Sequence, residues 1–147
     1  MSRLARLALV GCLLAAGCAA QNSGVSPTGS TVLDGLVGTW TLGSSSTAPA
    51  GCTTLDYTLA KNSDGTSAAV TFNGVCAGVS ATGTGTGTVS GSKLNWTAEG
   101  TATRDGLTCP FNLGEGTATR EGSGVRVTFA GTLCGLPVSG SELLQKK

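Results

Sequence analysis

The most regular feature of the chain is an alternation of small and polar residues in its middle third. From Val79 to Val89, the odd positions carry Val, Ala and Gly, whereas the even positions carry Ser and Thr. Turn residues follow at 90–92, and Leu94 and Trp96 then share one face of the next segment. Because successive side chains of a strand point to opposite faces, this two-residue period predicts a hairpin with one buried and one polar face.

Similar short segments, separated by turn residues, recur along the rest of the chain. No helical period of useful length follows residue 18, and only a short turn or 3₁₀ piece is expected at 33–36. The fold class is therefore all-β, an antiparallel up-and-down meander of about eight strands that closes into a small barrel, since closure removes exposed edges. A β-sandwich is the alternative. The expected strands are 36–43, 52–60, 67–77, 79–89, 93–104, 107–119, 124–134 and 136–144.

The first residues have the pattern of an export signal. Arg3 and Arg6 precede an uncharged apolar run of about eleven residues, which is shorter than the roughly 20 needed to span a bilayer. Small residues then lead to Cys18 and resemble the lipobox of bacterial lipoproteins. In that family the Cys is lipidated and becomes the first mature residue. Cys12 also follows a lipobox-like sequence, but too few apolar residues precede it.

This resemblance implies three regions. Residues 1–17 are the signal peptide, 18–31 are the lipidated Cys and a flexible tether, and 32–147 are the barrel-like domain. Ala19 stands where an Asp favours retention at the inner membrane in proteobacterial lipoproteins, so the outer membrane is expected. The predicted location is thus the bacterial cell envelope, with the membrane as a partner through the lipid anchor.

The four remaining cysteines predict two disulfides, because an even number in an exported domain forms a disulfide framework. A turn at 63–65 places Cys52 opposite Cys76, and a turn centred on 121–122 places Cys109 opposite Cys134. In each hairpin one cysteine, Cys52 or Cys134, is out of phase with the apolar residues of its own strand, and a β-bulge in each hairpin would correct this. The alternative pairs Cys76 with Cys109 and Cys52 with Cys134. The two hairpins also indicate an internal duplication, for which shared composition is the alternative explanation.

Residues 36–40, which include Gly38 and Trp40, resemble the G-x-W motif that opens the first strand of lipocalins and related calycins. In those barrels the Trp plugs one end and lies near an Arg from a late strand. The resemblance implies that Arg126 has this role here. The same opening, with a Cys and an alternating strand after it, is similar to bacterial metalloprotease inhibitors of calycin type.

Charge and composition exclude several classes of function. Removing residues 1–17 takes away two arginines, which leaves seven basic against eight acidic side chains and no basic patch for nucleic acid. The chain has no His, which excludes Ser-His-Asp and Cys-His catalysis, and no CxxC metal motif or nucleotide-binding loop. We therefore expect no enzyme activity, no cofactor and no metal. Glu99 and Glu115 are a possible carboxylate pair, but they are better explained as exposed charges.

Three functions remain open. The barrel could bind a small apolar ligand, contact a protein partner as a periplasmic protease inhibitor does, or serve as a structural envelope lipoprotein. An internal cavity would favour binding, whereas a filled barrel would favour the other two. The large residues expected inside are Trp40, Leu55, Tyr57, Leu59, Phe72, Leu94, Trp96, Phe111, Leu113 and Phe129.

Overall fold

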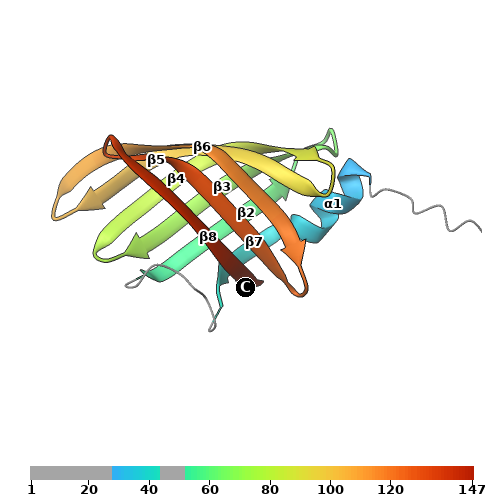
Figure 1. Cartoon of the computed structure of the whole chain (residues 1–147), viewed down its shortest axis with the longest axis horizontal. Helices are drawn as coiled ribbons and strands as arrows, with labels where there is room; N and C mark the ends of the chain where they lie inside the picture. The colour runs from blue at the N-terminus through green and yellow to red at the C-terminus, as the bar shows by residue number, and fades with distance from the viewer. Residues whose placement is uncertain (1–27, 44–51) are drawn as a thin grey trace, which may run out of the picture.

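The computed structural model describes residues 28–43 and 52–147, which form one helix and eight strands (Figure 1). The predicted signal peptide, Cys18 and most of the predicted tether lie outside these residues. The elements are α1 (Gly29–Leu36), β1 (Gly38–Leu42), β2 (Cys52–Lys61), β3 (Ser67–Cys76), β4 (Val79–Ser90), β5 (Lys93–Arg104), β6 (Leu107–Glu121), β7 (Gly124–Leu133) and β8 (Leu136–Lys146).

The strands form a closed antiparallel barrel in which each strand pairs with the next along the chain. β8 pairs back with β1, through Trp40 opposite Lys146 and Leu42 opposite Leu144, so the described sheet closes on itself. The predicted all-β class and the closed barrel are therefore confirmed, and the sandwich alternative is wrong. Every predicted strand is present, with its ends within two residues of the predicted ones.

The alternation along β4 and β5 orients these strands as the sequence predicts. On β5, Leu94, Trp96 and Ala98 are buried inside the barrel, and the residues between them are exposed. On β4 the inner face carries three glycines, two valines and one alanine, and the Ser and Thr residues face outward. Gly85 shows why the inner face needs small residues, because a Cβ there would lie 1.8 Å from the Thr97 carbonyl oxygen on β5. Glycine thus allows the strands to approach closely in a narrow barrel.

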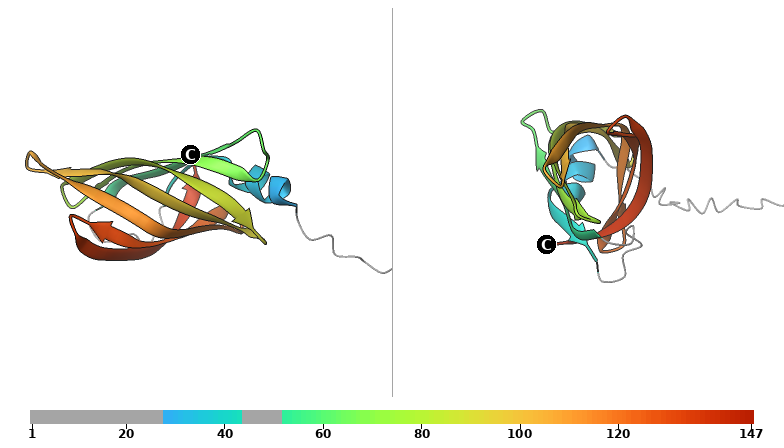
Figure 2. Two further views of the ribbon diagram at one scale, coloured as in Figure 1. Left: turned by 90° about the horizontal axis from the view of Figure 1, so that it is seen from above. Right: turned by 90° about the vertical axis from the view of Figure 1, so that its left-hand side faces the viewer.

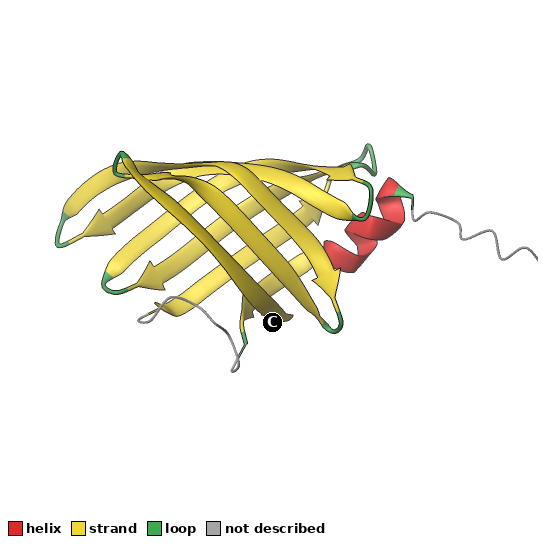
Figure 3. Ribbon diagram, in the orientation of Figure 1, coloured by secondary structure: helices red, strands yellow, loops and turns green. Residues whose placement is uncertain are grey.

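The helix α1 covers one end of the barrel. Its Leu33 and Leu36 are fully buried, and it contacts β2, β4, β5 and β6. Figure 2 shows α1 at the end of the barrel in its left-hand view and, seen along the barrel in its right-hand view, framed by the strands; Figure 3 shows it as the one helix among the described residues. An ion pair between Asp34 and Lys61 joins the helix to the end of β2. We call this end the helix end.

The helix corrects two predictions. The sequence predicted a short turn or 3₁₀ piece at 33–36 and a tether that continued to residue 31, but an eight-residue α-helix spans Gly29–Leu36. A helix of this length is marginal on its own propensity. Here burial of Leu33 and Leu36, which are three residues apart and so lie on one face, stabilises it against the strands.

Candidate ligand-binding lumen

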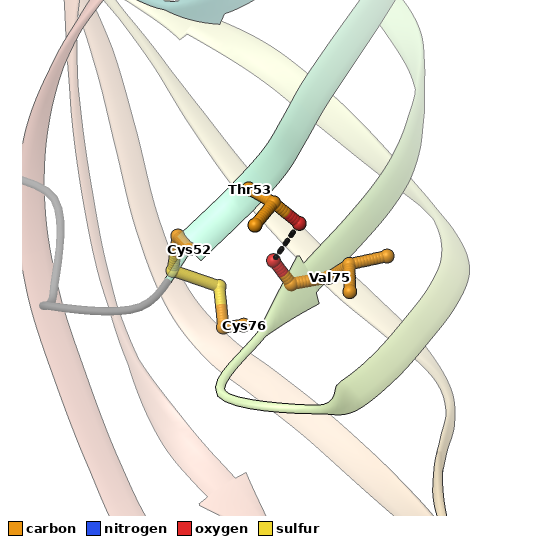
Figure 4. Close-up of a disulfide and its surroundings, with 4 residues drawn as sticks. All are labelled: Cys52, Thr53, Val75 and Cys76. Carbon is orange, nitrogen blue, oxygen red and sulfur yellow. Dashed lines mark hydrogen bonds between the residues drawn. A yellow bond between two sulfur atoms is a disulfide. The ribbon is translucent and has the colours of Figure 1, made fainter.

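The end of the barrel opposite α1, which we call the mouth, carries both disulfides. Cys52 is bonded to Cys76, and Cys109 is bonded to Cys134, as the hairpin argument predicts. Figure 4 shows the first bridge joining the start of β2 to the end of β3, next to the hydrogen bond from the Thr53 hydroxyl to the Val75 carbonyl (3.4 Å). The alternative pairing of Cys76 with Cys109 is wrong.

In each hairpin the sequence placed one cysteine on the opposite face from the apolar residues of its strand. An irregularity in the strand pairing of each hairpin accounts for this. The register between β2 and β3 shifts between Cys52 and Thr54, and that between β6 and β7 shifts between Asn112 and Glu115. An extra residue on one strand changes which face its neighbours occupy. The predicted bulges are therefore confirmed, and each bridge covalently joins two neighbouring strands at or near the mouth.

Trp40 occupies the helix end beneath α1. It is fully buried, and its indole Nε1 donates a hydrogen bond to the Leu36 carbonyl at 2.6 Å. Gly38, two residues earlier, has a φ of 124°, which side-chain-bearing residues rarely adopt. The two predicted motif residues thus set the turn from α1 into β1 and the position of the indole.

The cation beside this indole is not the predicted one. Arg120 on β6 lies 5.2 Å from the Trp40 ring centroid, and Lys146 on β8 lies 5.6 Å from it, both within the range of cation–π attraction. Arg126 instead makes an ion pair with Glu121 at 2.9 Å. The prediction failed because the sequence analysis considered only one Arg of the late strands.

Between Trp40 and the mouth the barrel contains a cavity of about 300 Å³. Aromatic rings form much of its wall. Tyr57 and Phe72 have ring centroids 5.1 Å apart, and those of Phe72 and Phe111 are 5.8 Å apart. The other lining residues are Cys52, Leu55, Gly74, Cys76, Val79, Ala81, Leu113, Phe129, Leu133, Val138, Ser139 and Glu142. The cavity is therefore largely apolar, and the large residues predicted inside are buried or partly buried.

Glu142 on β8 is the one carboxylate among the residues that line the cavity, and the sequence analysis missed it. The residue is 2% exposed, and its Oε2 has no hydrogen-bond partner among the described residues. Burial raises the pKa of this carboxyl to about 7. Burial and the nearby Glu142 charge also raise the pKa of Tyr57 above its usual range. The sequence does contain a signal for this position. Glu142 is an even number of residues from Val138 and Leu144, so it lies on the same face of β8 as these apolar residues.

The two other carboxylates considered from the sequence lie on the outside. Glu99 is opposite Asn112 and Glu115 is opposite Ala130, so the register does not pair them with each other, and both are exposed. Their interpretation as exposed charges fits this arrangement better than a catalytic pair.

Three last findings concern metal binding, membrane-spanning helices and similarity to known proteins. Within residues 28–43 and 52–147, no group of three or more Cys, Asp or Glu side chains is placed to hold a metal ion. In the same part of the chain, no helix is both long enough and apolar enough to cross a membrane. Comparisons with protein-family models, curated proteins and solved structures find no match. The similarity to calycins therefore stays a prediction carried by Gly38 and Trp40.

Proposed function

We propose that this chain is a lipid-anchored protein of the bacterial cell envelope whose barrel binds a small, largely apolar molecule in its lumen. The observation that carries the proposal is the cavity of about 300 Å³ between Trp40 and the mouth. Its size is at the lower end of the roughly 300–1,000 Å³ typical of small-molecule sites, and such sites are mostly lined by hydrophobic and aromatic side chains.

Two features support the cellular part of the proposal. The disulfides Cys52–Cys76 and Cys109–Cys134 suit an oxidising compartment such as the periplasm. The sequence before Cys18 has the charge, length and small residues of a lipoprotein signal. The disulfides agree with export, and the sequence before Cys18 agrees with anchoring through acyl chains.

One observation favours a second function, contact with a protein partner. Leu107 and Leu136 follow the turns that connect β5 to β6 and β7 to β8 at the mouth, and they are 80% and 69% exposed. Exposed leucines at loop tips are typical of interaction surfaces when they form a contiguous patch. Two exposed leucines are weaker support than a cavity, so we rank this function second.

The binding function can be tested with a variant that fills the cavity. Ala81 lines the cavity on β4, whereas its neighbour Thr82 faces outward and is exposed. We expect the full-length protein, reconstituted in phosphatidylcholine vesicles, to bind 1-octanol in calorimetric titrations corrected with protein-free vesicles. Ala81→Phe should abolish this binding, and Thr82→Phe should retain it. The proposal is wrong if the wild type binds no apolar probe, or if both variants bind like the wild type.

A further inference from the structure

We propose that the lumen selects small apolar amines, whose ammonium group binds the Glu142 carboxylate. This inference rests on the proposed function, because it specifies the chemical class of ligand for the same cavity. It assigns Glu142 as the residue that determines specificity, with the aromatic wall holding the apolar part of the molecule.

The position of Glu142 carries the argument. Its side chain is on the inner face of β8, is 2% exposed and lines the cavity. Its Oε2 has no hydrogen-bond partner in the part of the chain that the structure describes. A polar group buried without a partner is costly, and a charged one more so. A ligand that donates a hydrogen bond from within the cavity would remove this cost.

The charges around the cavity favour a cation over an anion. Among the described residues that line it, Glu142 and Tyr57 are the only ionisable groups, and none is Lys or Arg. An anionic ligand would lack an opposite charge and would face a carboxyl group. An ammonium group would form a charge-assisted hydrogen bond with Glu142, stronger than a bond between neutral groups.

The aromatic wall supports the same choice. The rings of Tyr57, Phe72 and Phe111 form a continuous part of the cavity wall, with neighbouring centroids 5.1 and 5.8 Å apart. Aromatic faces attract ammonium groups, and this attraction is larger in a site shielded from water. They also provide apolar contact for a hydrocarbon chain. Carboxyl and rings together therefore match an amine better than an alcohol of the same length.

Proton balance makes the binding depend on pH. Because burial raises the pKa of Glu142 to about 7, the empty site is largely protonated in mildly acidic solution. An ammonium ion that binds there displaces the carboxyl proton to solvent, so the affinity falls by up to about tenfold for each pH unit below 7. Tyr57 faces Glu142 from β2 and stays neutral, because its own pKa is raised. Across the β7 pairing, Val127 offers no ionisable group.

The test compares three probes of equal chain length: octylamine, 1-octanol and octanoate. The full-length protein in phosphatidylcholine vesicles is titrated by calorimetry between pH 5.5 and 8.5, with protein-free vesicles as the blank. We expect octylamine to bind the wild type at pH 8 about tenfold or more tightly than 1-octanol, and octanoate to bind weakest. Below pH 7 the octylamine affinity should decrease, and that for 1-octanol should not.

Two variants separate this inference from the proposed function. Glu142→Gln keeps the side-chain shape but removes the charge, so it should lose the preference for octylamine and its pH dependence while still binding 1-octanol. Glu99→Gln removes an exposed outer carboxylate and should behave like the wild type. If Glu142→Gln keeps the amine preference, or if octanoate binds best, the amine inference is wrong although lumenal binding stands. If no probe binds the wild type, the proposed function itself fails.

Discussion

Glu142→Gln should change how the stability of the barrel depends on pH. In the folded protein the pKa of Glu142 is raised from 4.5 to about 7 by burial. The native state therefore holds a proton that the unfolded chain releases, so this contribution to stability is complete below about pH 4.5 and is lost as the pH rises through 7. A shift of this size corresponds to at most about 3 kcal/mol at pH 8. The glutamine variant cannot ionise and should not show the loss.

The measurement is urea unfolding at several pH values from 5 to 8, without reductant, followed by tryptophan fluorescence. Both Trp40 and Trp96 are buried, so their emission reports unfolding. Wild type and variant should have similar free energies of unfolding at pH 5, and the variant should be more stable at pH 8. The lowered pKa values of Asp64 and Glu121 act in the opposite direction and at lower pH, outside this range. A wild type whose stability is constant or rises between pH 5 and 8 would refute the reasoning.

Three further predictions concern the backbone, the disulfides and the anchor. Gly85→Ala should destabilise the barrel by about 1–3 kcal/mol or more, because its Cβ would lie 1.8 Å from a carbonyl oxygen. Gly35→Ala in α1, where a Cβ meets nothing within 4 Å, should be neutral or stabilising, and thermal melts compare the two. Replacing both Cys52 and Cys76 by Ser should lower the free energy of unfolding by roughly 3.5 kcal/mol, measured in urea, and no change would contradict the chain-entropy estimate. Intact mass of the membrane-extracted protein should show loss of residues 1–17 and added acyl mass at Cys18, and a soluble, unacylated product would contradict the anchor.

The strands and their pairing could be predicted from the sequence because local signals were strong and consistent. The alternation along β4 set which face of that strand is inside, and short turns allowed little choice of neighbour. The disulfides followed from the same register. One cysteine of each pair was out of phase with the apolar residues of its strand, and this conflict predicted one bulge in each hairpin. The structure places these bulges at Cys52 and near Asn112.

The parts that sequence analysis missed depend on contacts between distant segments. Leu33 and Leu36 become a helix face only because the barrel end offers a surface to cover. Arg120 lies over Trp40 because barrel closure brings β6 and β1 to the same end, which no local pattern shows. Glu142 was overlooked because a single Glu in a polar C-terminal segment is usually exposed.

The β1–β8 ladder has a consequence for motion. It consists of three residue pairs, from Trp40↔Lys146 to Leu42↔Leu144, whereas β7 and β8 form nine pairs. The paired residues are about a hundred positions apart in the chain, and this short ladder is the contact that closes the barrel. Local opening is expected to begin where few contacts resist it. Glu142 precedes Leu144 by two residues on β8 and so lies next to the end of this ladder. Separation of β1 from β8 would therefore open the wall of the lumen beside the buried Glu142 carboxyl group.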